Sequence, residues 1–185
     1  MPLRLAVLAS LTGSLFEAMI KQQLPVQLMV ADRQCRALEI ADKAGIPYEF
    51  LPRTFGRTFD REEYTRAMMM LFRAYGIDLV AMAGFMTVFA PAMFAPDAYQ
   101  LRILNTHPSL LPSFKGDHAV RDALAYGVKI SGCTIHWATE KLDDGPILAQ
   151  EAVRVSSGDT IESLHERIKT VERELYPALL RELVA

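Results

Sequence analysis

The sequence has few cysteines and no long run of apolar residues. Cys35 and Cys133 are its only cysteines, and neither has CxxC spacing or a histidine cluster beside it. This excludes a disulfide framework and a zinc site, so both thiols are expected to be small buried side chains. No segment approaches the roughly 20 apolar residues of a membrane span. The first apolar run stops at Thr12 and Gly13 without a cleavage pattern, so it predicts a strand, and the cytoplasm is the expected location.

An excess of charge of one sign is also missing. The 20 basic and 22 acidic residues are mixed along the chain and leave a net charge of -2. Nucleic acid is therefore not an expected partner, because a phosphate backbone needs a basic stripe. A chain of 185 residues with 51% hydrophobic content can bury a proper core. A single domain over residues 1–185 is expected.

The first half of the sequence alternates apolar runs with amphipathic segments. Continuous apolar strands between helices indicate a parallel sheet that is covered on both faces, as in a Rossmann-like unit. The expected strands are 3–9, 26–31, 48–51 and 78–85, and the expected helices are 15–21, 35–44 and 61–75.

After Leu101 the pattern changes. Residues 103–107 form another apolar strand, 118–126 a helix, and 130–138 alternate as a strand with two different faces, with 147–155 as the antiparallel partner. A long helix is expected over 160–184, with Asp159 or Thr160 as its N-cap. The predicted fold class is α/β: an open, mostly parallel twisted sheet with antiparallel C-terminal strands and a long C-terminal helix.

Two polar residues stand at the end of the predicted strand 103–107. Asn105 and His107 are two residues apart, so they point to the same face, and Pro108 then ends the strand. In open α/β sheets the carboxyl ends of the strands form the ligand-binding edge. The simpler interpretation is that both side chains satisfy loop carbonyls.

A second polar stretch, LDDGPI at 142–147, favours a chemical role for this pair. It places Asp143 and Asp144 in a loop between two strands. A carboxylate beside His107 would orient the imidazole and favour its charged form, and the amide of Asn105 beside it would stabilise an oxyanion. Ser109 follows His107 but lacks the glycine elbow of a hydrolase nucleophile.

Three stretches resemble the phosphoribosylglycinamide formyltransferases, which belong to the folate-dependent formyltransferase superfamily. They are NTHPSLLPSFKG, GCTIHWATEKLDDGPI and SGDTIESLHERIKTVERELYP. AGFM at 83–86 and the N-terminal VLASLTGS fall where that family has its folate wall and phosphate loop, so the likeness covers essentially the whole chain.

The resemblance implies transfer of a formyl group from 10-formyltetrahydrofolate, as co-substrate, to the amine of glycinamide ribonucleotide in purine biosynthesis. It implies a catalytic trio of Asn105, His107 and Asp143, with no metal, and a monomer or homodimer. Two alternatives stay open: a different acceptor amine, or hydrolysis of formyltetrahydrofolate. A folate-binding remnant without activity is disfavoured because all three catalytic positions remain.

The resemblance also implies binding residues. His118 and His136 fall on family histidines and are interpreted as residues that support the catalytic ones or the fold, and not as part of the chemistry. For Met86 and Phe89 the simpler interpretation is that they pack in the core. For Arg61 and Glu172 it is that they are solvated charges on a helix surface. The folate positions are Arg61, Met86, Thr87, Val88, Phe89, Asn105, Ala138, Thr139, Glu140, Lys141 and Asp143; the ribonucleotide and phosphate positions are Thr12, Gly13, Ser14, Leu15, Pro108 and Glu172.

The sequence departs from the family pattern at several of these positions. The phosphate loop reads LTGSL where the family usually has Gly-x-Gly-Ser-Asn, so Leu11 and Leu15 replace a flexible and a polar residue. Thr87 stands where an arginine is frequent, and Asp144 where glycine is frequent. Two adjacent carboxylates repel, so one of them is expected to titrate high unless Lys141 compensates.

Overall fold

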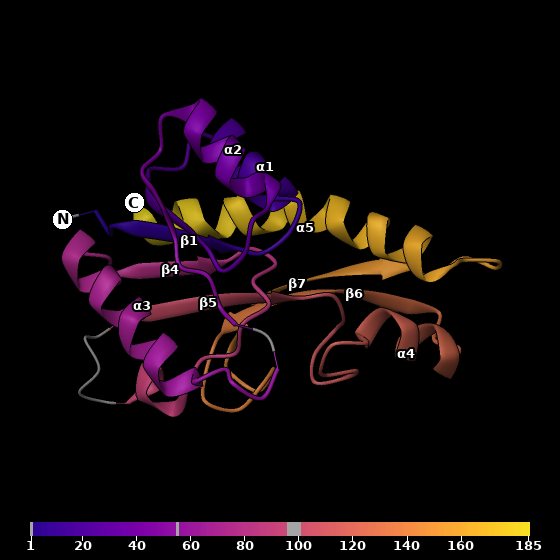
Figure 1. Cartoon of the computed structure of the whole chain (residues 1–185). Coiled ribbons are helices and arrows are strands. Elements are labelled where there is room, and N and C mark those ends of the chain that lie inside the picture. Colours follow the sequence, from indigo (N-terminus) through magenta and orange to yellow (C-terminus); the bar gives the residue numbers. More distant parts are fainter. Residues whose placement is uncertain (1, 55, 96–100) are drawn as a thin grey trace.

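The computed structural model describes residues 2–54, 56–95 and 101–185. Within these residues seven strands form one sheet in the order β3-β2-β1-β4-β5-β6-β7 (Figure 1). The pairs from β3 to β5 are parallel, and β6 and β7 are antiparallel to their neighbours. The strands are β1 Leu5–Ala9, β2 Val26–Ala31, β3 Tyr48–Phe50, β4 Leu79–Met82, β5 Arg102–His107, β6 Ile130–Trp137 and β7 Ile147–Arg154. The predicted mixed sheet is confirmed.

Helices cover both faces of this sheet (Figure 1). One core lies under α1, α2 and the C-terminal half of α5, and a second lies under α3 and η1. A third, smaller cluster joins α4 and the N-terminal half of α5 to β6 and β7. The helices are α1 Ser14–Lys21, α2 Arg36–Ala44, α3 Arg61–Tyr75, η1 Pro91–Phe94 (a 3-10 turn), α4 Ala119–Tyr126 and α5 Ile161–Val184.

Most predicted boundaries agree with the structure to within one or two residues, and β4 is the main exception. It ends at Met82 instead of residue 85, because Gly84 adopts a left-handed backbone with φ 74° and turns the chain out of the sheet. The turn η1 was not predicted. At α5 the N-cap is Thr160, whose side chain accepts a hydrogen bond from the Ser163 amide in a capping box.

Both cysteines are free thiols. Cys133 is buried, and burial raises the pKa of its thiol to about 11, which makes it unreactive. Cys35 is half-buried at the start of α2. No helix in the described ranges is long and apolar enough to cross a membrane.

Candidate active site

The predicted site lies next to the point where the strand order of the sheet reverses, which is between β1 and β4. From β1 the chain moves outward through β2 and β3, then returns to β4 on the other side of β1. Crevices open at such a point because the loops after the two strands diverge. Asn105 and His107 lie on β5, the strand beside β4, and Asp143 lies in the loop between β6 and β7.

Asn105 has a histidine as its direct cross-strand neighbour. It pairs with His136 in the antiparallel register of β5 and β6, so the two side chains share one face. Asn105 Nδ2 donates to His136 Nε2 at 3.3 Å, and His136 Nδ1 donates to the Trp137 carbonyl at 2.9 Å. His136 is 2% exposed, and burial lowers the pKa of its imidazole. His136 therefore lies inside the site as a neutral ring.

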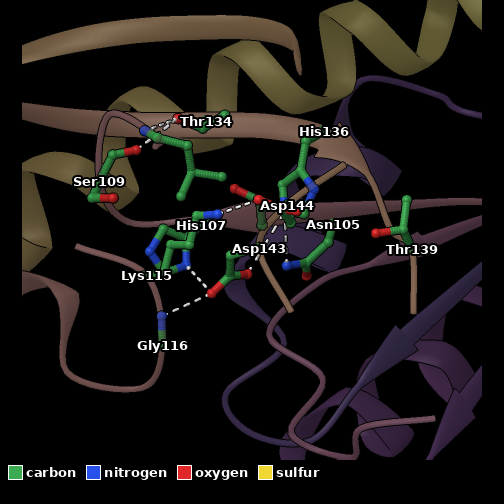
Figure 2. Close-up of polar contacts among 12 residues, drawn as sticks. Asn105, His107, Ser109, Lys115, Gly116, Thr134, His136, Thr139, Asp143 and Asp144 are labelled. Carbon is green, nitrogen blue, oxygen red and sulfur yellow. Dashed lines mark hydrogen bonds and ion pairs between the residues drawn. The ribbon is translucent and has the colours of Figure 1, made fainter. Parts of the chain in front are cut away.

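His107 is held between the carboxylate of Asp143 (Figure 2) and a backbone carbonyl of the loop after β5. Its Nδ1 lies 3.3 Å from Asp143 Oδ2, and its Nε2 lies 2.8 Å from the Phe114 carbonyl oxygen. His107 and Asp143 are 4% and 5% exposed. Both ring nitrogens face acceptors, and only a doubly protonated ring can donate to both. His107 thus lies beside a buried carboxylate, with an acceptor facing each of its ring nitrogens.

The loop from Pro108 to Gly116 closes one side of this pair. The Gly116 amide donates to Asp143 Oδ2 at 2.9 Å (Figure 2). Thr134 Oγ1 on β6 donates to the Ser109 carbonyl and accepts from the Leu111 amide. The Ser109 hydroxyl donates to the Ser113 carbonyl at 2.6 Å, so it braces the loop and is not presented as a nucleophile.

Asp144 behaves differently from its neighbour Asp143. It is exposed and forms an ion pair with Lys115 of the loop (Figure 2). The Lys115 ammonium, with a smaller effect from Lys141, lowers the pKa of Asp144. Of the two adjacent carboxylates, Asp144 is therefore not one with a raised pKa, because Lys115, more than the expected Lys141, supplies the compensating charge.

The simpler interpretation of Glu172, a solvated charge on the surface of α5, is wrong. The side chain is half-buried against the opposite face of β5, where Thr106 Oγ1 donates to its Oε1 at 2.6 Å. Burial raises the pKa of its carboxyl group, although the hydroxyl and the nearby Lys169 and Arg173 oppose this. Glu172 is thus an acid that is kept from water next to the strand that carries Asn105.

Replacing Glu172 by glutamine is expected to raise the melting temperature at about pH 8. A carboxyl group whose pKa is raised by folding contributes most stability when it is protonated, and loses that contribution as the pH rises through the raised value. Glutamine keeps an acceptor for Thr106 but cannot ionise. Its advantage should therefore shrink as the pH falls to about 4. Thermal unfolding of this variant beside Glu174→Gln, an exposed control on α5, measures the effect; equal shifts in both variants would contradict it.

The predicted folate positions after β4 alternate between surface and interior. Met86 and Val88 are each 49% exposed and can form a wall. Phe89 packs on Phe85 in the core, and the Thr87 hydroxyl donates to the buried Asp32 at 2.5 Å. The side chains of Thr87 and Phe89 are therefore turned away from the surface, and these two positions can contact a ligand only through their backbone groups.

The remaining folate positions lie in two other segments. Arg61 is exposed at the first turn of α3, a helix that begins at the same edge of the sheet. Ala138 is half-buried and hydrogen-bonded to Ile103, and the three residues after it, Thr139, Glu140 and Lys141, are exposed. Thr139 is drawn with the site in Figure 2.

The predicted phosphate loop follows β1. Gly13 has φ 67° at the N-cap of α1, and a Cβ there would lie 3.0 Å from Ala37, so this position requires glycine. Thr12 is exposed and Ser14 is half-buried, but the Leu15 side chain is buried in the core. Leu15 can offer a ligand only its backbone amide.

Three features of the site were missed from the sequence. They are the Phe114 carbonyl beside His107, the Lys115 partner of Asp144, and the contacts of His136 with Asn105 and Asp143; His136 Nε2 lies 3.8 Å from Asp143 Oδ1. For His136 a signal existed, since it alternates with Thr134 on the two-faced strand. In the described ranges no group of three or more His, Cys, Asp or Glu residues is placed to hold a metal ion.

Sequence relatives of this chain are formyltransferases. A model of the formyl transferase family matches residues 3–180. Phosphoribosylglycinamide formyltransferase of Mycobacterium tuberculosis H37Rv is 44% identical over 98% of this chain and 85% of that protein. The Bacillus subtilis enzyme of the same name is 34% identical over 98% of this chain and 94% of that protein.

Solved structures agree with these relatives. The phosphoribosylglycinamide formyltransferase of Streptococcus pneumoniae superposes with a TM-score of 0.89 at 34% identity, covering 99% of both chains. Glycinamide ribonucleotide transformylase 1 of Geobacillus kaustophilus gives 0.87 at 35% identity, with complete coverage of both. The match of nearly the whole sequence and of the whole sheet, together with the paired histidine and aspartate at its carboxyl edge, establishes that this chain belongs to the formyl transferase family.

Proposed function

We propose that this protein transfers the formyl group of 10-formyltetrahydrofolate to the amino group of glycinamide ribonucleotide. The observation that carries this proposal is the convergence of Asn105, His107 and Asp143 at the carboxyl edge of the sheet. It occurs in a chain whose full-length relatives are named for this activity. The folate donor supplies an activated formyl carbon, and the residues of this chain stabilise the charge that develops on it and transfer the proton.

The reaction forms one bond and breaks another. The amine nitrogen attacks the formyl carbon, whose oxygen becomes an oxyanion, and the bond from that carbon to folate N10 then breaks. The proton lost by the amine is the one that N10 gains, and the buried carboxylate of Asp143 is placed to carry it. Asn105 Nδ2 and the charged ring of His107 stabilise the oxyanion in a site from which water is largely excluded.

The carbonyl of Phe114 limits how His107 can contact an oxyanion. In this structure it accepts the hydrogen bond of Nε2 at 2.8 Å, while Nδ1 faces Asp143. An oxyanion that takes a direct hydrogen bond from Nε2 must therefore replace the Phe114 carbonyl. Without that exchange, His107 acts through its charge and Asn105 is the direct donor.

The substrates are assigned to the two loops that flank the switch in strand order. Met86 and Val88, with residues 138–141 opposite, form the proposed folate wall. The amides at the start of α1 face no side-chain cap, so Gly13 and Ser14 are proposed to hold the substrate phosphate. The Arg36 guanidinium also lies at this loop, where it donates to the Thr12 carbonyl at 3.4 Å and pairs with Glu17 at 3.1 Å.

An absorbance assay with two conditions tests the proposal. The protein is incubated with 10-formyltetrahydrofolate, with and without glycinamide ribonucleotide, and the release of tetrahydrofolate is followed. Release that depends on the ribonucleotide is expected. Release without any acceptor would instead identify a hydrolase, and no release in either condition would point to another acceptor amine.

We infer that residues 1–185 act as one formyltransferase domain on small-molecule substrates, in the cytoplasm and as a monomer or homodimer. The family match over residues 3–180 and the relatives named phosphoribosylglycinamide formyltransferase support this inference.

A further inference from the structure

We propose that His136 is a positioning residue for formyl transfer, and that its neutral ring fixes the orientation of the Asn105 carboxamide by accepting one of its N–H groups. This inference rests on the proposed function, because it concerns how Asn105 presents a donor to the oxyanion. The proposed chemistry uses Asn105, His107 and Asp143 but gives His136 no task, although this ring is among the most buried polar groups at the site.

The tautomer of His136 follows from its backbone contact. Nδ1 lies 2.9 Å from the carbonyl oxygen of Trp137, so this nitrogen carries the hydrogen. In a neutral imidazole the other nitrogen then has a free lone pair. Burial lowers the pKa of the ring and keeps it neutral near pH 7. Nε2 is consequently an acceptor and cannot donate.

An acceptor at this place determines which way the amide of Asn105 is turned. Nε2 lies 3.3 Å from Asn105 Nδ2. If the carboxamide were rotated by half a turn, its oxygen would face the lone pair of Nε2 and the contact would become repulsive. The NH₂ group is therefore held on the side of His136, and its second hydrogen remains available for the formyl oxygen.

The sheet gives this contact a rigid support. Asn105 and His136 are paired residues of β5 and β6, so their backbone positions are set by the sheet register. The same Trp137 carbonyl that fixes the tautomer lies against Gly145, where a Cβ would come within 1.7 Å of it. The His136 ring is thus fixed by backbone contacts: the strand pairing sets its position, and the Trp137 carbonyl, packed against Gly145, sets its orientation.

A charged ring at position 136 would work against the site. Its Nε2 would carry a hydrogen, repel the NH₂ of Asn105 and turn toward Asp143 Oδ1, which lies 3.8 Å away. It would then compete with His107 for the same carboxylate. His107 and Lys115 oppose the charging of His136, Asp143 favours it, and desolvation decides for the neutral form. The buried environment therefore keeps Asp143 paired with His107.

A double-mutant cycle tests the proposal. The variants are His136→Leu, which has no acceptor, His136→Gln, which can place an amide oxygen near Nε2, Asn105→Ala, and the double variant His136→Leu with Asn105→Ala. His136→Leu is expected to lower kcat about tenfold or more, with the KM for both substrates within about twofold, because a misoriented amide loses much of the oxyanion donor. In the Asn105→Ala background the same change should lower kcat by less than about twofold. His136→Gln should recover most of the lost kcat.

Several outcomes would overturn the proposal. Equal losses from His136→Leu with and without Asn105 would mean that His136 does not act through the amide, and a glutamine variant no better than leucine would remove the acceptor role. His165→Gln on α5, a half-buried histidine outside the site, is the matched control and should keep full activity. A wild-type protein without transfer activity would instead refute the proposed function.

A measurement without variants covers the case in which His136→Leu does not fold. Long-range proton–nitrogen NMR spectra of the wild-type protein near pH 7 report the tautomer of each histidine ring. We expect His136 to carry its hydrogen on Nδ1 alone. A ring protonated on Nε2, or on both nitrogens, would refute the acceptor role whatever the kinetics show.

Discussion

Asp143→Asn is expected to lower kcat by about 10²–10⁴-fold while leaving the protein folded. The substitution removes the negative charge that lies 3.3 Å from His107 Nδ1 and the base that takes the proton of the amine. Asparagine retains an oxygen that can accept from the Gly116 amide, and it tolerates the left-handed backbone of this position, φ 51°, as well as aspartate does. Steady-state kinetics together with thermal unfolding measure both parts of the expectation.

The neighbouring carboxylate provides the control. Asp144→Asn removes the same charge one residue away, but Asp144 is exposed and paired with Lys115, and exposed ion pairs contribute little because water screens them. We expect its kcat to stay within about threefold of wild type, since the Gly116 and Phe114 contacts of the loop persist. If the two variants lost equal activity, net charge at the site and not the His107 pair would be responsible.

Gly145→Ala is expected to lower the free energy of unfolding by about 3 kcal/mol and to reduce kcat as well. A Cβ at this position would lie 1.7 Å from the carbonyl oxygen of Trp137, which is backbone and has no way to rotate aside. The loop that carries Asp143 would have to move away from β6. Because the Trp137 amide also donates to the Pro146 carbonyl at 2.9 Å, this displacement breaks the closure of the loop. Denaturant unfolding measures the stability change.

Gly127→Ala separates this steric effect from backbone strain. Gly127 ends α4 with φ 83°, and a Cβ there would meet no atom within 4 Å among the described residues. Alanine at this position is expected to cost about 1 kcal/mol through its left-handed conformation and to leave kcat unchanged. A Gly145→Ala variant no less stable than Gly127→Ala would contradict the steric argument.

The order of strands and helices could be predicted because hydrophobic periodicity is a local property. Residues 61–75 end at Gly76, which adopts φ 62° and stops the helix as the sequence suggests. The end of β4 could not be predicted, since residues 83–85 contain no polar side chain after they leave the sheet. Phe85 is still buried there, in the core cluster that includes α3 residues. The alternation of buried and exposed side chains after β4 could not be predicted either. Thr87 is buried because it donates to Asp32, a partner 55 positions away in the sequence.

At the site, strand alternation correctly predicted that Asn105 and His107 share a face. The contacts that determine their chemical state depend on backbone groups of a loop, such as the Phe114 carbonyl, and no residue type identifies such groups in advance. Glu172 was misjudged because its helix pattern is polar, whereas its burial results from the position of α5 over β5. Resemblance to a family identified the reacting side chains, and only the packing of distant segments identified their partners.

The pairing of Asn105 with His136 also determines where this chain can change in length. Side chains alternate along a strand, so one residue inserted into β5 or β6 would turn either side chain to the opposite face of the sheet and dismantle the donor. The segments around Leu11 and from Thr139 to Leu142 are exposed, and added residues there need not alter that register. Insertions and deletions are thus expected to be tolerated in these two exposed segments, where they can change the surface of the proposed site without moving the amide of Asn105.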